Sequence, residues 1–500
     1  MRSLRRILIA GGGSSGWMTA ALLSKLFRGL YEITLVESED IGIIGVGEAT
    51  IPAIKKYLEI LGLNEKEFMQ GTQGTFKMGI QFNNWGQVGD SYLHGFGVIG
   101  QELEWLRMHH YWLKARENGW AEKFDAYSIN AIGALENKFM HARADMAESP
   151  LGHIGYAYHF DAGLFARFLS GFAQNNGVRR REGKIVDVTL RGEDGFIESI
   201  ALDDGEKLEA DLFIDCTGFR SLLLGGVMQV EFVDWSRWLL CDSALAMPCA
   251  RSDNFTPYTK STAHGAGWQW RIPLQHRTGN GHVYSSKFIS DAEAEKVLRE
   301  NLDAAPLADP LQVRFTPGKR ARLWNKNCVA IGLAGGFLEP IESTALHLVQ
   351  SGILQLVKLF PNLDFDPATI AEYNRRTDFD YERIRDFIIL HYKATTRDDT
   401  PFWNYCRTMD VPATLERKID LWMADGRVFR EDDELFAEES WIQVFIGQGM
   451  IPRGYDPQVN LQSDADLTAF LSNIAATIRK CAAVMPTHAE YVAKFCPASA

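Results

Sequence analysis

The first thirty residues alternate between apolar and glycine-rich stretches in an order that predicts a nucleotide site. An apolar run over residues 6–10 enters the glycine turn 11–16, and a helical pattern follows over 17–27. Strand, turn and helix in this order are what a dinucleotide-binding unit requires. Glycines at 11, 13 and 16 permit a tight turn, close approach of the backbone to a pyrophosphate, and close packing of helix on strand. The first N–H groups of such a helix face the phosphates.

A second apolar run supports this prediction. Residues 32–36 alternate like a strand and end in Glu37, twenty-one residues after Gly16. A carboxylate at that spacing accepts hydrogen bonds from ribose hydroxyls. A glycine-rich turn with no ligand is the alternative, but the flanking strand, helix and acid together favour dinucleotide binding.

Further strands follow much later in the chain. Residues 185–190 and 197–202 alternate like the two arms of a hairpin with its turn at 192–195. Buried strands are also expected over 210–218 and 328–332, and a helix over 342–359. From about residue 361 the pattern becomes amphipathic and helical, with expected helices over 370–393, 415–425 and 464–484.

These elements predict an α/β fold: a Rossmann-like FAD-binding module of the two-part flavoprotein monooxygenase type, with a largely helical C-terminal substrate region. We expect the FAD module to comprise residues 1–100 and 150–360. The mainly helical substrate-binding region is then expected over 101–149 and 361–500.

Composition and charge narrow the classes of partner. The 500 residues are 46% hydrophobic and carry a net charge of -12, with no polybasic block. Nucleic-acid binding needs clustered Lys and Arg, so a nucleic-acid partner is not expected. The apolar runs are too short to cross a membrane, which favours a cytoplasmic protein. The seven cysteines lie without a Cys-x-x-Cys pair, so we expect reduced core thiols and no metal site.

One family accounts for motifs spread over almost the whole chain. The motifs are Gly11 to Gly16, Gly45 to Pro52, Phe76-Lys77, His94 to Gly97, His159 to Ala162, Asp215 to Ser221, Trp268-Gln269-Trp270-Arg271-Ile272-Pro273, Glu339 to Thr344, and Arg397 to Trp403. With these motifs in this order, the chain resembles the flavin-dependent tryptophan halogenases. Trp-x-Trp-x-Ile-Pro, called the tryptophan box below, is the signature of that family.

The resemblance implies an activity and its partners. FADH2 from a separate, transiently bound flavin reductase reacts with O2, and a halide ion is converted to hypohalous acid that halogenates an aromatic substrate. The resemblance places FAD against ten residues: Gly11, Gly13, Ser14, Ser15, Gly16, Glu37, Ala49, Ile185, Leu333 and Leu346. A monomer and a homodimer are both compatible with it.

Two residues match the family's catalytic pair. Lys77 matches the lysine, whose ammonium can polarise hypohalous acid or whose free amine can form a haloamine. Its neighbours Phe76, Met78, Ile80 and Phe82 predict an apolar setting. Glu342 matches the carboxylate that stabilises the cationic ring intermediate and accepts its proton. It is also an ordinary acid for the first turn of a helix, and both roles are compatible.

The halide and substrate positions follow from the same resemblance. Thr344 and Ala345 lie where the family binds halide, and Ala345 replaces the usual glycine, which leaves the preference between chloride and bromide open. His94 and Phe96 match aromatic residues that sandwich an indole ring. The resemblance implies that the tryptophan box lies near the flavin and disfavours oxygenation of the substrate; simple packing is the alternative.

The substrate lid differs from that of the tryptophan-specific members. Residues 428–441 are short and acidic and carry no tyrosine pair, and such an acidic run is usually a solvated face. Phe436 is the candidate stacking aromatic in this segment. We therefore expect free indole or an indole derivative as the substrate. A tryptophan halogenase proper and a flavin monooxygenase of the same fold are the alternatives.

Overall fold

The computed structural model describes residues 4–41, 47–103, 105–252 and 255–498, and the chain forms two compact units. Unit 1 comprises Met1–Gly74, Phe160–Asp242 and Arg314–Glu382, and unit 2 comprises Thr75–His159, Ser243–Val313 and Arg383–Ala500. Each unit is therefore assembled from segments that are distant in the sequence. Gly45 and Val46, part of one halogenase-like motif, lie outside the described residues.

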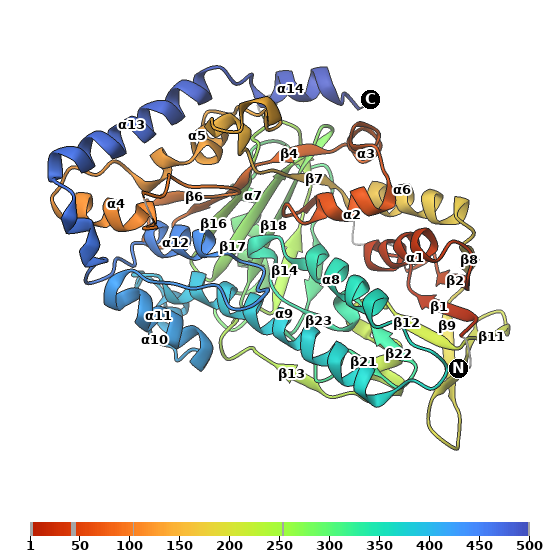
Figure 1. Cartoon of the computed structure of the whole chain (residues 1–500). Helices are drawn as coiled ribbons and strands as arrows, with labels where there is room; N and C mark the ends of the chain where they lie inside the picture. The colour runs from red at the N-terminus through yellow and green to blue at the C-terminus, as the bar shows by residue number, and fades with distance from the viewer. Residues whose placement is uncertain (1–3, 42–46, 104, 253–254, 499–500) are drawn as a thin grey trace. The chain divides into compact units, whose positions relative to one another are not determined.

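Unit 1 is built around a six-stranded, mainly parallel sheet (Figure 1). Its order is β21 (Trp324–Asn325), β22 (Cys328–Ala330), β12 (Leu212–Asp215), β1 (Arg6–Ala10), β2 (Glu32–Glu37) and β8 (Arg179–Glu182). All neighbours are parallel except β21 with β22. Residues 7–10 are buried, as expected for a central parallel strand. This is the Rossmann-like sheet that the sequence predicts.

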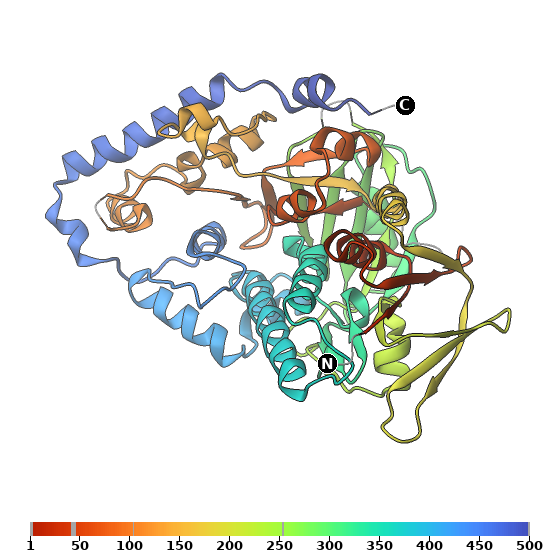
Figure 2. The same cartoon turned by 45° about the vertical axis from the view of Figure 1, so that its right-hand side comes forward.

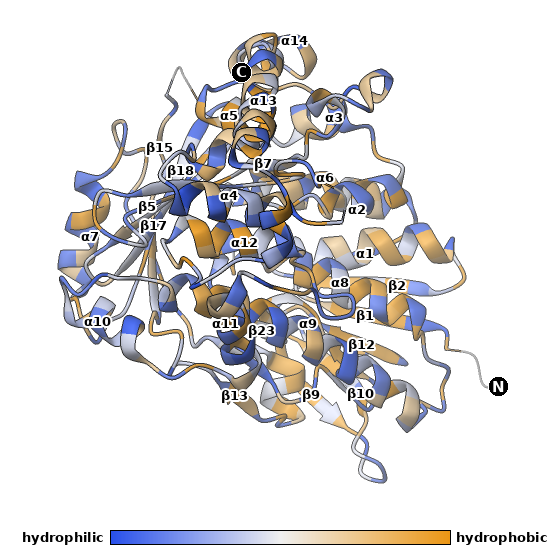
Figure 3. Cartoon of the chain, turned by 60° about the vertical axis from the view of Figure 1, so that its left-hand side comes forward, coloured by the Kyte–Doolittle hydropathy of each residue, from blue (hydrophilic) through white to orange (hydrophobic). Residues whose placement is uncertain are grey.

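Helix α1 (Ser14–Phe27) packs against α6 (Ala162–Asn175) and α8 (Ala345–Lys358) in this unit. It is coloured largely as hydrophobic in Figure 3, and every residue from Gly16 to Ser24 is buried. A helix that is apolar on all sides belongs in the interior. Unit 1 also contains α2 (Ile54–Leu61), α3 (Glu65–Gly71) and the short strand β3 (Gly47–Ala49).

Two small antiparallel sheets complete unit 1. One has the order β11 (Lys207–Glu209), β10 (Ile197–Leu202) and β9 (Ile185–Leu190), which confirms the expected hairpin. Ile197, Ile200 and Leu202 belong to the same hydrophobic core cluster as Phe213 of the main sheet. The other has the order β13 (Phe232–Asp234), β20 (Gly318–Arg320) and β23 (Gly336–Phe337).

Unit 2 contains the largest sheet. Its order is β19 (Leu311–Arg314), β14 (Ser243–Ala246), β18 (Arg277–Tyr284), β17 (Gly267–Pro273), β16 (Thr259–His264), β5 (Gly79–Asn83) and β6 (Ser91–Gly95), with β15 (Cys249–Ala250) paired to β18. Helix α7 (Asp291–Glu300) packs on β18 and β14. Outside this sheet, β4 (Thr75–Lys77) pairs antiparallel with β7 (Ala157–Asp161).

The C-terminal region is helical, as predicted. It contains α10 (Pro401–Thr408), α11 (Ala413–Asp425), α12 (Glu438–Gly447), α13 (Asp464–Ala483) and α14 (His488–Phe495). In Figure 2, α13 is the long blue helix, and it packs along α4 (Met108–Glu117) and α5 (Ile129–Leu135). The long α9 (Pro367–Lys393) runs from unit 1 into unit 2.

Short helical turns connect these elements: η1 (Phe124–Tyr127), η2 (Ala144–Met146), η3 (Pro150–Gly152), η4 (Gly218–Arg220), the π-helical η5 (Leu222–Val227), η6 (Gly332–Ala334), η7 (Pro340–Glu342) and η8 (Pro457–Leu461). One of them, η7, shifts the start of an expected helix. The helix expected from Glu342 begins only at Ala345, because Ser343 adopts a left-handed conformation with φ 59° that ends η7.

Three expected features can be compared directly with the structure. All seven cysteines are free, and six of them are buried, as expected for core thiols. The described part of the chain contains no group of three or more His, Cys, Asp or Glu side chains placed to hold a metal ion. Nor does any helix in the described ranges have both the length and the apolar character needed to cross a membrane.

Candidate active site

The glycine turn of unit 1 is shaped by two close backbone approaches. A Cβ on Gly11, which has φ 106°, would lie 2.3 Å from the carbonyl oxygen of Cys216. A Cβ on Gly16 would lie 1.8 Å from the carbonyl oxygen of Gly11. Gly13 differs, because a Cβ there would meet nothing within 4 Å. Gly11 and Gly16 therefore serve the turn itself, and Gly13 leaves open space over it.

The start of α1 is suited to an anion. Gly13 is its N-cap, makes no side-chain capping bond, and is followed by Ser14 and Ser15 with no acidic residue in the first turn. Uncapped N–H groups at a helix start attract phosphate. The open space at Gly13 and the uncapped helix start together fit the diphosphate of FAD.

Glu37 lies beside this turn, at the end of β2. Its carboxylate accepts hydrogen bonds from Trp17 Nε1 at 3.2 Å and from Arg180 Nε at 2.5 Å. A Cβ on Gly12 would lie 2.5 Å from Glu37 Cβ, so a larger residue there would displace Glu37. The structure thus places the predicted ribose-binding carboxylate against the predicted phosphate turn.

The other expected FAD residues are spread over unit 1. Leu333 lies in η6, whose Gly332 approaches the turn closely: a Cβ on Gly332 would lie 2.2 Å from Ser15 Oγ. Leu346 is the second residue of α8 and is buried. Ala49 ends β3, and Ile185 begins β9 in the hairpin sheet.

Glu48, next to Ala49, is a further titratable group in this unit. Burial, with a smaller contribution from the Asp161 carboxylate, raises the pKa of Glu48 to about 7. The sequence signal was its place in the Gly45 to Pro52 motif, but no spacing rule marks it as titratable near neutral pH.

Unit 1 contains a second polar site, at the start of α8. Glu342 ends η7 with a fully buried side chain, and Thr344 is the N-cap of α8. Thr344 Oγ1 is buried and has no hydrogen-bond partner among the described residues, and the first turn, beginning at Ala345, carries no acid and no capping side chain. An unpartnered hydroxyl at an uncapped helix start is a suitable donor set for a small anion.

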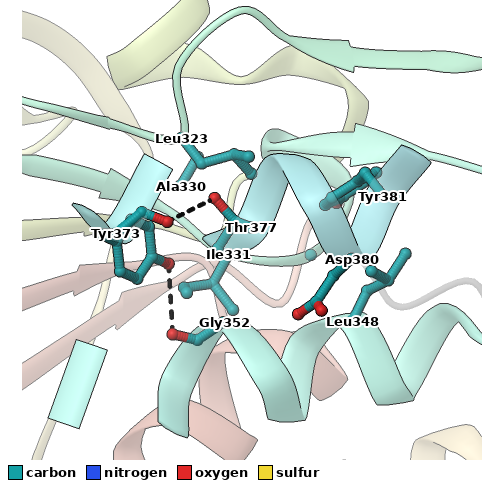
Figure 4. Close-up of a pocket in the computed structure, with 10 residues that line it drawn as sticks. Leu323, Ala330, Ile331, Leu348, Gly352, Tyr373, Thr377, Asp380 and Tyr381 are labelled. Atoms are coloured by element: carbon teal, nitrogen blue, oxygen red, sulfur yellow. Dashed lines mark hydrogen bonds between the residues drawn. The ribbon is translucent and has the colours of Figure 1, made fainter. Parts of the chain in front are cut away.

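The cavity in Figure 4 lies elsewhere in unit 1. Its volume is about 10 Å³, room for one water molecule. Tyr373 Oη donates a hydrogen bond at 3.2 Å to the Gly352 carbonyl beside it, and Thr377 Oγ1 donates one at 3.0 Å to the Tyr373 carbonyl. This cavity is far too small for an aromatic substrate.

Lys77 occupies the apolar setting that the sequence predicts. It ends β4 in unit 2 and is fully buried, and Phe76, Met78, Ile80 and Phe82 are each 0% exposed. Lys77 Nζ lies 5.2 Å from the centroid of the Phe96 ring, within cation–π range. The lysine is therefore a buried functional group and not a solvated surface residue.

The expected substrate-binding aromatics of unit 2 lie close together. Phe436 stacks on Phe387 with ring centroids 3.9 Å apart and planes at 25°. His94, on β6, lies 5.9 Å from Phe387 and 6.5 Å from Phe436. Phe96 follows two residues after His94 and contacts Lys77. Unit 2 thus brings His94 together with Phe387 and Phe436, and it also contains the contact between Phe96 and the candidate catalytic lysine.

The acidic run near Phe436 is only partly a solvated face. Asp432 and Asp433 are exposed, but Glu434 is buried and accepts a hydrogen bond from Lys418 Nζ at 2.8 Å. Glu431 pairs with Arg383 at 2.7 Å. The expectation of a solvated acidic face is therefore wrong for Glu431 and Glu434, because they pair with cations on α9 and α11.

The tryptophan box forms most of β17. Trp268 and Trp270 lie on one face, as predicted, with ring centroids 6.1 Å apart. Trp268 contacts Trp85, and Trp270 lies over its cross-strand partner Gly281, where a Cβ would come within 2.0 Å of the indole ring. The two tryptophans therefore have clear packing partners inside the sheet.

The chain is similar to known proteins over nearly its whole length. The chain matches the family described as tryptophan halogenase over residues 6–464. It is 34% identical to the tryptophan 6-halogenase SttH of Streptomyces toxytricini over 98% of both chains. A flavin-dependent halogenase from Xanthomonas campestris is 48% identical, covers 100% of both chains, and has a TM-score of 0.96. Another, from Brevundimonas sp. BAL3, is 44% identical over 99% of both chains, with a TM-score of 0.95.

A dinucleotide turn on a Rossmann-like sheet in one unit, together with a second, larger sheet in the other unit, is typical of a two-part flavoprotein. Within that class, this chain belongs to the tryptophan halogenase family. It is a flavin-dependent halogenase, which uses FADH2, O2 and a halide ion together with a separate flavin reductase and an aromatic substrate.

Proposed function

We propose that this halogenase acts on free indole or a closely related electron-rich arene. The observation that carries the proposal is the cluster of His94, Phe387 and Phe436 in the same unit as Lys77. Flat aromatic side chains bind a flat ring by stacking and edge contacts.

The polar groups beside this cluster argue against an amino-acid substrate. Recognition of free tryptophan needs groups for its ammonium and its carboxylate. Residues 428–441 contain no tyrosine pair, and Glu431 and Glu434 are already paired with Arg383 and Lys418. Glu438 and Glu439 pair with Arg107. These four glutamates are engaged in ion pairs, which supports a substrate without an ammonium group.

The names of the relatives are compatible with this proposal. SttH and the tryptophan 7-halogenase RebH of Lentzea aerocolonigenes, named for tryptophan, are 34% and 35% identical to this chain. The Xanthomonas and Brevundimonas halogenases, 48% and 44% identical, carry names that specify no substrate. Similarity is thus greater to proteins that are not named for tryptophan.

Residues of unit 1 would hold FAD and the halide ion. Residues 11–16 and Glu37 would hold FAD, which in its reduced form supplies with O2 the oxidising equivalent for hypohalous acid. Thr344 Oγ1 and the first N–H groups of α8, from Ala345, would hold the halide. Because the Thr344 hydroxyl has no partner among the described residues, halide binding would satisfy a buried donor.

Lys77 and Glu342 would each have one role in the substitution of the aromatic ring. The Lys77 ammonium donates a hydrogen bond to the oxygen of hypohalous acid and so makes the halogen more electrophilic. The ring forms a carbon–halogen bond while the oxygen–halogen bond breaks, and the leaving hydroxide takes a proton from the Lys77 ammonium and departs as water. Exchange with solvent then returns a proton to the lysine. The Glu342 carboxylate stabilises the ring cation and accepts its proton. Halogenated arene and water are the products.

A direct comparison of substrates tests the proposal. The enzyme is supplied with FAD, NADH, a flavin reductase and bromide or chloride, and either indole or tryptophan is added. We expect the mass shift of one halogen on indole with the higher kcat/KM. A higher kcat/KM on tryptophan would overturn the substrate assignment. An oxygenated product without halogen would instead favour a monooxygenase.

The role of Lys77 is tested by substitution. We expect Lys77→Ala to lower halogenation by about a thousandfold or more, since a group that acts on the reacting atoms is lost. FAD binding, measured by flavin fluorescence, should be unchanged because the FAD residues lie in unit 1. Lys77→Arg keeps the positive charge but not the shape of the ammonium, and serves as the comparison. Retained halogenation in Lys77→Ala would remove the lysine from the mechanism.

A further inference from the structure

The tryptophan box and His159 belong to sequence motifs that have no assigned role in this reaction. Both belong to unit 2, and hydrogen bonds join them to the strand that carries Lys77. Thr75 Oγ1 donates a hydrogen bond to the carbonyl oxygen of Pro273, the last residue of the box, at 2.7 Å. The same hydroxyl lies 3.1 Å from His159 Nδ1.

These contacts lie on the same face of β4 as the Lys77 side chain. Thr75 and Lys77 are two residues apart in a strand, so their side chains point the same way. His159 is the cross-strand partner of Thr75, and the small Ala157 is the partner of Lys77. His159 and Lys77 are therefore diagonal neighbours on one face. Phe76, between them in sequence, points to the other face and stacks on Phe139 with centroids 4.1 Å apart.

The directions of the hydrogen bonds fix the protonation of His159. A carbonyl oxygen can only accept, so the single hydroxyl proton of Thr75 goes to Pro273. Thr75 must then accept from His159, which places a proton on Nδ1. The other ring nitrogen, Nε2, lies 2.9 Å from Thr259 Oγ1, whose hydroxyl donates to it when the ring is neutral. The hydrogen bonds thus place a proton on Nδ1, and the neutral form of His159 that fits them has a bare Nε2.

The surroundings favour this neutral form. His159 is fully buried, and burial, followed by the charge of Lys77, holds its pKa well below the usual range. A second histidine, His488, is neutral for a similar reason. Its Nε2 accepts a hydrogen bond from the Phe76 N–H at 3.1 Å, and its Nδ1 donates one to the Phe255 carbonyl at 3.2 Å. Neither histidine places a second positive charge beside the lysine.

We propose that His159 and Thr75 are positioning residues for Lys77. They fix its strand to the end of the tryptophan box, with His159 held as the neutral Nδ1–H tautomer. The inference rests on the proposed catalytic role of Lys77. In it, the carbonyl of Pro273, the last residue of the box, helps to hold the strand of Lys77 in place. An error of about 1 Å in the position of such a group costs on the order of a hundredfold in rate.

The first test removes only the Thr75 hydroxyl. Thr75→Val keeps the shape of the side chain, and Thr75→Ser keeps the hydroxyl. We expect Thr75→Val to lower kcat by about tenfold or more with the arene KM within about twofold, because chemistry and not binding is affected. Thr75→Ser should stay within about threefold of the parent enzyme. A Thr75→Val enzyme that is folded and has the parent kcat would overturn the proposal.

A second pair of variants tests the tautomer, and it decides the question if Thr75→Val does not fold. In His159→Asn the amide N–H replaces Nδ1–H, and in His159→Gln it replaces Nε2–H. We expect the Asn variant to retain more than about ten times the kcat of the Gln variant. Equal losses in both would overturn the proposal.

A third measurement needs neither FAD nor turnover. With ¹⁵N-labelled histidine, the signals that disappear in His159→Asn belong to His159, and their shifts report which nitrogen carries the proton. We expect a protonated Nδ1 and a bare Nε2 throughout pH 6–8 in the whole chain. The Nε2–H tautomer or an imidazolium would contradict the inference. If Lys77→Ala keeps its activity, the proposed catalytic role of Lys77 fails; if only the Thr75 and His159 results fail, the positioning role alone is wrong.

Discussion

Single residues show what the sequence could and could not reveal about the site. The apolar neighbours of Lys77 follow from the sequence alone and are all buried in the structure. Glu37 was expected at the nucleotide turn because its distance from Gly16 is fixed by the strand–turn–helix unit. The hydrogen bonds of Thr75 with Pro273 and with His159 were not expected, because contacts over 198 and 84 residues depend on tertiary packing that local patterns do not encode.

Thr344 offers a prediction about the halide. Its hydroxyl is buried and has no hydrogen-bond partner among the described residues, so removal of the hydroxyl leaves no protein partner unsatisfied. We expect Thr344→Val to raise the KM for halide by about tenfold or more, since a donor to a buried anion contributes about 1.5–3 kcal/mol. The KM for the arene should change little, and stability should be retained. Steady-state kinetics with varied bromide and chloride checks this, and an unchanged halide KM would exclude Thr344 as a halide donor.

Glu48 gives a prediction about pH. Its pKa is about 7 in the folded chain, above the ordinary value of 4.5, so the fold favours the protonated carboxyl. Between these two values the folded state binds more protons than the unfolded state, so the contribution of Glu48 to stability falls as the pH rises. We expect the Tm of Glu48→Gln relative to the parent to increase by about 2 °C or more between pH 5 and pH 8.

Thermal unfolding of both chains at pH 5 and pH 8 measures this difference. Glu193→Gln, at an exposed position in the hairpin turn, is the control and should show no such trend. A Glu48→Gln difference that is the same at both pH values would show that Glu48 is ionised in the fold.

Whole elements were predicted where their apolar periodicity is strong. The β9–β10 hairpin and the helices α9, α11 and α13 lie where the sequence places them, with ends moved by a few residues. Strand β8 was missed because its sequence, Arg179-Arg180-Arg181-Glu182, has no apolar face. Its arginines are held by ion pairs, such as Arg180 with Glu37 and Arg181 with Glu206. An edge strand that depends on ion pairs leaves no hydrophobic signal in the sequence.

The segment before α12 depends on one buried ion pair. The side chains of Lys418 and Glu434 are 4% and 1% exposed, and Lys418 also donates to the Phe429 carbonyl at 2.8 Å. Lys418→Met would leave the Glu434 carboxylate buried without a cation. We expect a loss of about 3–5 kcal/mol in the free energy of unfolding. The arene KM should rise as well, because Phe436 lies two residues after Glu434.

Urea unfolding and arene kinetics measure these two effects. Arg417→Met is the matched control, since Arg417 pairs with Glu431 from an exposed position and should cost no more than about 1 kcal/mol. The double variant Lys418→Met/Glu434→Met should recover most of the lost stability, because two apolar side chains replace a buried pair. If Lys418→Met is as stable as the parent, the pair does not anchor the segment.

At the scale of the whole molecule, the sequence indicated an α/β flavoprotein but not how the chain is divided. Each unit gathers three separate segments, and the main sheet of unit 1 takes β1 and β2 from the N-terminal end and β12 and β22 from far downstream. Single strands are visible in the apolar pattern. Their order is set by pairing between distant segments, for which a single sequence carries no local signal.

The binding of FAD to the folded chain gives a last prediction. A ligand that binds only the folded state adds about 2.7 kcal/mol of stability at a hundredfold excess over Kd, so FAD should raise the Tm of the parent chain. Gly13→Ala should fold as stably as the parent without FAD, because a Cβ there meets nothing within 4 Å and φ is -73°.

With FAD present, the same substitution should lose most of the Tm increase, since the new methyl group fills the space proposed for the diphosphate. Gly16→Ala is the contrasting variant: its Cβ would lie 1.8 Å from the Gly11 carbonyl, so it should be destabilised even without FAD. Thermal unfolding of the three chains with and without FAD separates the two effects. A full FAD-dependent increase in Gly13→Ala would mean that the diphosphate binds away from this turn.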